Sequence, residues 1–163
     1  MVQRLNADLI TGRLPPESTV RLACDLLMVG VETPTVVELA GESPTRLTLG
    51  DAVPLVRQVL VELGVEPVDP TKAAWTVARD VARQMLTGDL LPEDGAAMLW
   101  DLWEDCENSP VIARMLEPLE AWQETLPEDR DDEAIRDEMR RLAPAVVHTG
   151  DARLAAEEPG GRA

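Results

Sequence analysis

Three carboxylates in the second half of the chain have a spacing that could hold a metal ion. Asp101, Glu104 and Asp105 stand at positions i, i+3 and i+4, which places side chains on one face of an α-helix. Carboxylate oxygens of this kind bind hard divalent cations. A solvated acidic face on an amphipathic helix is the simpler interpretation of the same pattern. Further carboxylates, which a second helix could supply, are Asp131, Asp132, Asp137 and Glu138.

This group of acids is similar to the sites of all-helical nucleotide pyrophosphohydrolases, in which helix carboxylates bind magnesium. The resemblance implies a divalent-metal-dependent hydrolase, with Mg²⁺ holding the phosphates of the substrate. The chain departs from that family because it lacks the paired E-E-x-x-E and E-x-x-D spacings, and it has no cluster of Lys or Arg beside the acids. The hydrolase is therefore the alternative hypothesis and not the leading one.

Other catalytic chemistry has little support in the sequence. There is no glycine-rich phosphate loop, no G-x-S-x-G and no H-E-x-x-H, the motifs that would signal nucleotide binding, a serine nucleophile or a zinc site. The only histidine, His148, is expected to be exposed beyond the last helix. We therefore expect a protein that is not an enzyme, with no catalytic residue and no bound cofactor or metal. Mg²⁺ would enter only under the hydrolase alternative.

The four tryptophans all lie within residues 67–146, and the chain has no Phe or Tyr to accompany them. Trp100 and Trp103 flank the three carboxylates, and Trp122 lies further along. Tryptophans near charged residues can form the centre of a protein–protein interface. They can equally fill the core between helices. The predicted interaction residues are Trp100, Trp103, Trp122, Asp101, Glu104 and Asp105.

The positions of glycines and prolines indicate an internal repeat. Residues 10–39 and 86–115 align without a gap and agree at eight positions. In each copy a glycine ends one helix and a Pro-Glu pair begins the next, as the stop and start preferences of helices require. An aspartate is also kept, as Asp25 in one copy and Asp101 in the other. The residues expected to form these junctions are Gly12, Pro16, Glu17, Asp25, Gly88, Pro92 and Glu93.

The hydrophobic pattern follows a helical period throughout, so we predict an all-α fold of about eight helices. They are arranged as two tandem four-helix repeats with pseudo-twofold symmetry, packed as one globular unit. Repeat 1 covers residues 1–66, with helices at about 2–11, 16–29, 34–40 and 51–63. Repeat 2 covers residues 67–146, with helices at about 72–87, 92–106, 110–124 and 132–143. Residues 147–163 are predicted to be a disordered tail.

Charge gives the strongest indication of function. The net charge is −16, and residues 89–138 alone hold seventeen acidic side chains against three arginines. Such a field repels nucleic acid and anionic membranes and attracts a basic protein. The leading hypothesis is an acidic helical interaction protein, an adaptor or an immunity- or antitoxin-like inhibitor, that docks on a basic partner or on itself. High net charge also serves solubility alone.

The remaining features concern the compartment. Cys24 and Cys106 are not closely paired, and both lie in apolar patterns, which indicates reduced, buried thiols. No apolar stretch is long enough to span a bilayer, and the first residues do not resemble a signal peptide. We predict a cytoplasmic protein. Only one of the fifteen basic residues is lysine, which indicates a GC-rich and bacterial genome.

Overall fold

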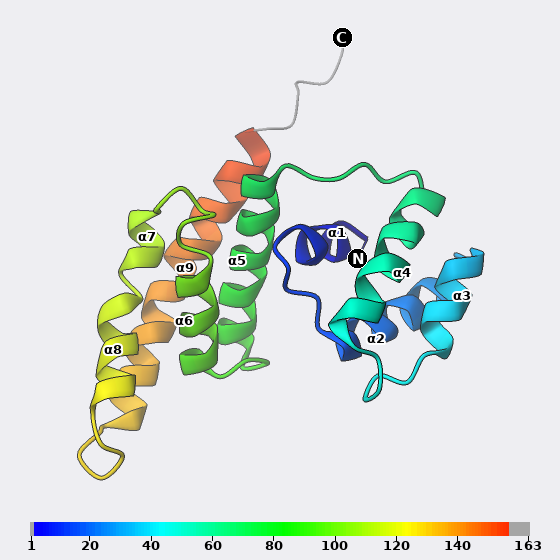
Figure 1. Cartoon of the computed structure of the whole chain (residues 1–163). Helices are drawn as coiled ribbons and strands as arrows, with labels where there is room; N and C mark the ends of the chain where they lie inside the picture. Colours follow the sequence, from blue (N-terminus) through cyan, green and yellow to red (C-terminus); the bar gives the residue numbers. More distant parts are fainter. Residues whose placement is uncertain (1, 157–163) are drawn as a thin grey trace. The chain divides into compact units, whose positions relative to one another are not determined.

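The computed structural model describes residues 2–156 of the chain, and within them the regular structure is entirely helical (Figure 1). This confirms the predicted all-α class. Eight helices have eight or more residues, and a further one, α7, has four. They are α1 (Val2–Ile10), α2 (Pro16–Met28), α3 (Pro34–Gly41), α4 (Leu49–Glu62), α5 (Pro70–Thr87), α6 (Pro92–Asp101), α7 (Pro110–Ala113), α8 (Leu116–Glu124) and α9 (Asp132–Ala156).

The chain divides into two compact units, Met1–Ala73 and Ala74–Ala163. The boundary therefore falls inside the first turns of α5, whereas the sequence predicted it at residue 66. Helix α5 begins early because Asp69 caps it: its carboxylate accepts hydrogen bonds from the backbone amides of Thr71 and Lys72, at 2.9 and 3.1 Å. An acceptor at this position satisfies amides that have no partner within the helix.

Unit 1 is built around an aliphatic core. Helix α2 packs on α3, while α1 and α3 both pack on α4. Val36, Val56 and Val59 are completely buried at its centre. A polar contact closes the unit, since Glu62 near the end of α4 accepts hydrogen bonds from the hydroxyl of Thr35 (2.6 Å) and from its backbone amide (3.2 Å). The carboxylate of Glu62 on α4 thus accepts hydrogen bonds from the first turn of a different helix, α3.

The two predicted helix junctions share one local backbone hydrogen bond. After α1, the amide of Arg13 donates to the carbonyl of Asp8 (2.8 Å), and after α5 the amide of Asp89 donates to that of Gln84 (3.0 Å). Each bond spans six residues, as in a Schellman ending. Gly12 and Gly88 occupy the left-handed position inside these turns, with φ of 68° and 82°. The next helices, α2 and α6, both begin at a proline.

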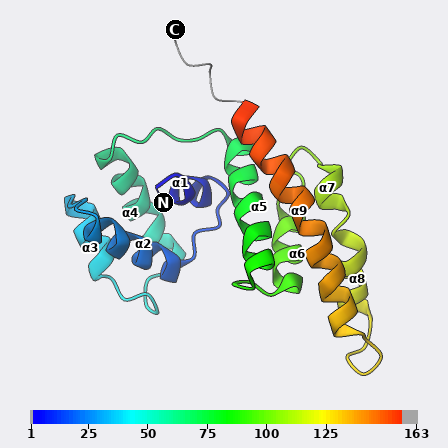
Figure 2. The same ribbon diagram turned by 180° about the vertical axis from the view of Figure 1, so that it is seen from behind.

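Unit 2 contains α5 from Ala74 onward together with α6 to α9. Helix α9 packs against α6, α7 and α8, and the views from the front and from behind agree on this arrangement (Figures 1 and 2). Helix α5 is approached closely at two glycines. A Cβ at Gly95 would lie 2.4 Å from Cγ of Met85, and one at Gly150 would lie 2.9 Å from Cβ of Arg79. Glycine at these positions allows α6 and α9 to approach α5.

Two of the helices predicted for this part of the chain, 92–106 and 110–124, have different bounds in the structure. Helix α6 ends at Asp101 and not at residue 106, because residues 102–108 form turns that close at Glu107 and Asn108, both with positive φ. The predicted helix 110–124 is two helices, α7 and α8. Pro118 lies in the first turn of α8, where a missing amide hydrogen costs nothing, so the break falls before it.

The last helix is much longer than predicted. We expected it to end near residue 143 and the tail to be disordered from residue 147, but α9 continues to Ala156. This extension makes long-range contacts: Asp151 pairs with Arg83 at 2.9 Å, and Arg153 pairs with Glu107 at 2.7 Å. The rest of the predicted tail, residues 157–163, lies outside the described residues. His148 is exposed, as predicted, but it lies within the helix.

Candidate functional site

The three carboxylates singled out by their spacing do not share a helix face. Asp101 is the last residue of α6, while Glu104 and Asp105 lie in the turns that follow. All three are exposed. Within residues 2–156, no group of three or more His, Cys, Asp or Glu side chains is placed so as to hold a metal ion. The metal hypothesis required these three carboxylates to lie on one face of a helix, and the structure does not place them so.

The tryptophans occupy three different environments. Trp75 is 1% exposed and belongs to the core of unit 2. Trp100 and Trp103 are half-buried and stack on each other, with ring centroids 5.1 Å apart and planes inclined by 10°. Trp122 is also half-buried, but it lies among arginines. Trp100 and Trp103 thus form one pair, and Trp122 belongs to another cluster.

Two arginines contact the ring of Trp122 and tie the end of α8 to the start of α9. The guanidinium carbon of Arg130 lies 3.6 Å from the ring centroid and that of Arg136 lies 4.7 Å from it. Arg130 also donates to the backbone carbonyl of Trp122 and to the carboxylate of Asp132, each at 2.6 Å. Its hydrogen bond and charge lower the pKa of Asp132. Trp122 is therefore engaged within its own unit.

Glu93 pairs with one of these arginines. Its side chain is only 10% exposed, and its carboxylate accepts from Arg136 at 2.5 and 3.0 Å in a bidentate arrangement. These hydrogen bonds hold the pKa of Glu93 below its ordinary value and raise that of Arg136. The sequence placed Glu93 at a helix start, which is correct, but it did not reveal the pairing with α9. Its counterpart Glu17 is exposed.

Asp25 and Asp101, the aligned aspartates, have different surroundings. Asp25 is half-buried in α2. It lines a hollow of about 220 Å³ in unit 1, together with Arg4, Asp8 and Arg21. Asp101 is exposed at the end of α6. The two positions thus share a residue type and differ in exposure.

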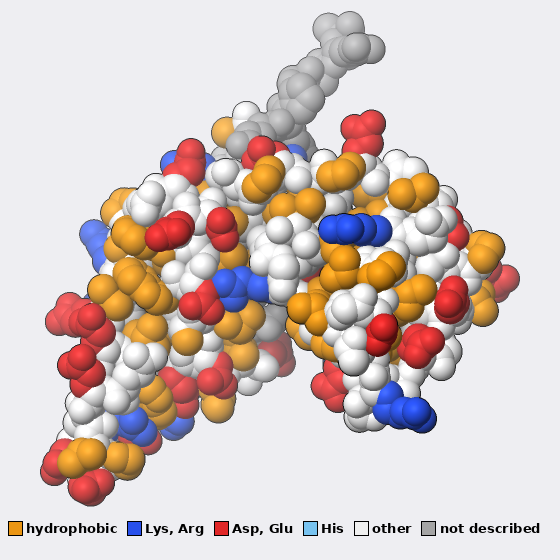
Figure 3. All heavy atoms as spheres, viewed as in Figure 1, with side chains coloured by type: hydrophobic (Ala, Val, Ile, Leu, Met, Phe, Trp, Pro, Cys, Tyr) orange, Lys and Arg blue, Asp and Glu red, His pale blue; other side chains and the backbone are white. Residues whose placement is uncertain are grey.

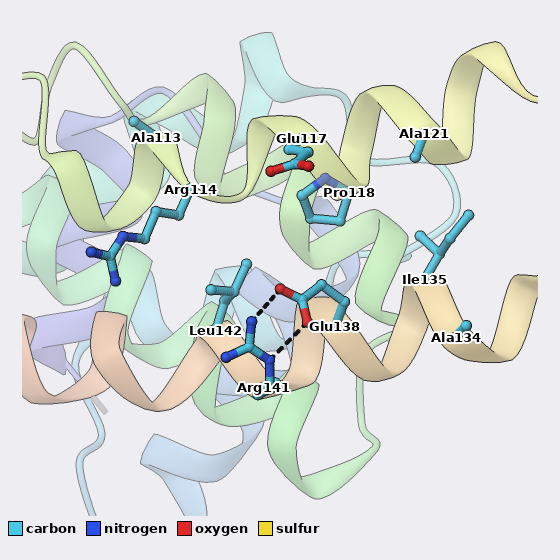
Figure 4. Close-up of a pocket in the computed structure, with 10 residues that line it drawn as sticks. All are labelled: Ala113, Arg114, Glu117, Pro118, Ala121, Ala134, Ile135, Glu138, Arg141 and Leu142. Carbon is cyan, nitrogen blue, oxygen red and sulfur yellow. Dashed lines mark hydrogen bonds and ion pairs between the residues drawn. The ribbon is translucent and has the colours of Figure 1, made fainter.

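A groove runs between α7–α8 and α9, with a volume of about 630 Å³ (Figure 4). Small and aliphatic side chains face it from both walls, and four charged residues lie among them. Ala121 and Ala134 leave the space open because they are short. The residues that line the groove are Ala113, Arg114, Glu117, Pro118, Ala121, Ala134, Ile135, Glu138, Arg141 and Leu142.

Exposed acidic side chains follow α8 and continue around the turn that joins it to α9. We call this set the acidic surface: Glu117, Glu120, Glu124, Glu128, Asp129, Asp131 and Glu133, all exposed. The space-filling view shows acidic groups along α8 and at this turn, at the lower left (Figure 3). Several other acids of unit 2 pair with arginines, but within the described residues no ion pair neutralises a member of the acidic surface.

Comparisons with known proteins do not assign this chain to a family. No family model, no curated protein and no solved structure matches the chain. None of the described helices combines the length and apolar character needed to cross a bilayer. The groove and the acidic surface are therefore interpreted from their own geometry and charge.

Sequence reasoning missed the groove and the arginine cluster. The alanines that open the groove look like ordinary helix residues in the sequence. In the sequence, Arg130 and Arg136 stand out only as two of the three basic residues within the acidic stretch 89–138. A signal for the groove did exist: Ile135, Glu138 and Leu142 recur at a helical spacing, which would place them on one side of the last helix. The sequence alone does not show which helices face that side across the groove.

Proposed function

We propose that this chain is a non-enzymatic interaction protein that docks through unit 2 on a basic protein. The observation that carries the proposal is the acidic surface, seven exposed carboxylates on α8, the turn that follows it and the first turn of α9. Uncompensated carboxylates repel one another and attract cationic groups. Binding to a basic surface would relieve this repulsion. The proposal does not include nucleic acid or anionic membranes as partners, because they carry the same sign of charge as the acidic surface.

The partner is either a different, basic protein or a second copy of the chain. An adaptor or an immunity- or antitoxin-like inhibitor fits the first possibility. The high acidity of the whole chain, −16, favours the first, since two copies would bring like charges together. A cytoplasmic location belongs to the same proposal.

The test is a comparison of captured partners between the wild-type chain and a charge variant. In the variant, Glu117, Glu120 and Glu124 on α8 are replaced by glutamine, which keeps their shape. A matched control replaces Glu17, Glu38 and Glu42 of unit 1 in the same way. The chains are immobilised, exposed to native lysate at about 50 mM salt and washed at about 200 mM, where surface charges are screened more strongly.

A partner of the proposed kind is retained by the wild type and by the unit 1 control at low salt. It is lost from the α8 variant and from the wild type at the higher salt. A partner that remains bound to the α8 variant, or that resists salt, contradicts electrostatic docking by the acidic surface. Self-association is measured in parallel by sedimentation of the purified chain, which detects a dimer directly.

We also propose that the two units descend from one duplicated helical module. Support comes from the matched sequence positions and from the local backbone hydrogen bond that the two junctions share. Prolines begin α2 and α6, and again α3 and α7, at the same offset along the chain. An experimental structure in which each unit is superposed on the other tests the proposal, because dissimilar paths for α1–α4 and α5–α9 would contradict it.

A further inference from the structure

The groove beside the acidic surface has the shape and composition of a site for a helix. Its apolar lining consists of alanine, proline, isoleucine and leucine side chains from α7, α8 and α9, and we call these side chains its floor. Along α9 it extends from Ala134 to Leu142, which at the rise of an α-helix is about 12 Å, or roughly two turns. An amphipathic helix inserts apolar anchors at i, i+3 or i+4 and i+7 over such a length.

The charges around the groove differ between its two ends. Arg114 and Arg141 lie toward one end of the groove, and Ala121 and Ala134 lie at the other (Figure 4). The second end adjoins the turn between α8 and α9, which carries three of the seven members of the acidic surface, Glu128, Asp129 and Asp131. Arg141 pairs with Glu138, whereas Arg114 makes no ion pair with any of the described residues. Glu117 and Glu138 line the middle of the groove (Figure 4). A ligand that lies along the groove therefore meets Arg114 at one end, and acidic side chains from the middle toward the other end.

We propose that the groove binds an amphipathic helix of the basic partner. The apolar face of that helix lies on the floor, its lysines or arginines face Glu124, Glu128 and Asp129, and a carboxylate at its other end pairs with Arg114. This inference rests on the proposed function and adds where and how the partner binds. Charge complementarity at both ends fixes the direction of the helix, and the apolar floor supplies the contact area.

A synthetic peptide of about eighteen residues, long enough to cover the groove as a helix, serves as the probe. It carries leucines at a helical spacing on one face, glutamates in its first turn and lysines in its last two turns. A scrambled peptide of the same composition lacks the apolar face. Binding to the full chain is measured by fluorescence anisotropy of the labelled peptide at low salt.

Two groove variants and one control separate the contributions of shape and charge. Ala121→Phe fills the floor, and we expect about tenfold weaker binding because a central anchor position is lost. Gln123→Phe places the same side chain on the exposed opposite side of α8 and should leave binding unchanged. Arg114→Glu should weaken binding, and a peptide with lysine in place of its first-turn glutamates should restore it. Circular dichroism establishes that each variant is folded.

The inference is supported if the wild type binds the designed peptide but not the scrambled one, and if Ala121→Phe weakens that binding. It also requires that Arg114→Glu weakens binding and that the peptide with lysine in its first turn restores it. Equal affinity of Ala121→Phe and wild type overturns it, as does the absence of binding by the wild type up to millimolar peptide. In either case a salt-sensitive partner captured through α8 still supports the proposed function, so the two failures are distinguishable.

Discussion

Replacing Glu93 by glutamine tests the ion pair that joins α6 to α9. The substitution keeps the size of the side chain but removes the charge that Arg136 contacts at 2.5 and 3.0 Å. A hydrogen bond to a charged group contributes roughly 1.5–3 kcal/mol. Because Arg136 is 32% exposed, water replaces part of this contribution, and we expect a loss of about 1–2 kcal/mol. In a unit of this size that lowers Tm by roughly 4–8 °C per kcal/mol.

The effect of this substitution should depend on pH with a definite sign. The folded-state pKa of Glu93 lies below its ordinary value of 4.5, because Arg136 donates hydrogen bonds to the carboxylate. The stabilisation is therefore fully present above pH 4.5 and is lost as the pH falls through the folded-state pKa. Once the wild-type carboxyl is protonated, its stability should approach that of the Glu93→Gln variant.

Urea unfolding followed by tryptophan fluorescence measures this in unit 2 alone, since all four tryptophans lie there. Glu17→Gln is the matched control, because Glu17 holds the aligned position in α2 but is exposed. We expect that control to change stability by no more than about 0.5 kcal/mol. If the two variants behave alike at neutral pH, or if the gap between Glu93→Gln and wild type persists in acid, charge pairing is not the source of the stability.

Four other expectations concern both units. Glu62→Gln should lower the Tm of unit 1 at neutral pH, followed by far-ultraviolet circular dichroism. The difference should vanish as the pH falls from 4.5 to about 2, since hydrogen bonds from Thr hydroxyls lower the pKa of Glu62 to about 2. Gly95→Ala should destabilise unit 2 by about 1–2 kcal/mol, as the cost of overpacking exceeds the gain in helix propensity; Gly41→Ala, with open space around it, should not. A thiol reagent should modify exposed Cys24 rapidly and Cys106 only on unfolding, because burial raises the pKa of Cys106 to about 12. Millimolar Mg²⁺ should leave Tm unchanged, and a rise would revive the metal hypothesis, because a ligand that binds the folded state stabilises it.

The helix starts were the most predictable part of the fold. Thr33 followed by Pro34 has the signature of a capped first turn, and the side chain of Thr33 accepts a hydrogen bond from the amide of Val36 in the structure. Burial was less predictable. Cys24 was expected on an apolar face and is exposed, since its neighbours Ala23 and Leu26 already fill the side of α2 that faces the core.

Helix ends that depend on distant residues could not be predicted. The apolar period continues through Trp103 and Cys106, yet α6 ends at Asp101, and residues 102–108 form turns whose last two residues, Glu107 and Asn108, have positive φ. In the same way, the groove depends on how α8 and α9 lie together. No local sequence pattern predicts the distance between α8 and α9. The acidic residues could therefore be found from the sequence, but the surface that they share could not.

Pro144 lies in the middle of α9 and has a mechanical consequence. Proline has no amide hydrogen, so the carbonyl of Arg140 lacks its regular helical donor. The residues before this point form one wall of the groove, and those after it lie against α5 at Gly150. The stiffness of α9 is thus lowest around Pro144, where the part that lines the groove meets the part that packs on α5. A displacement of the groove wall can be absorbed by bending at that turn, before it disturbs the packing that keeps the unit folded.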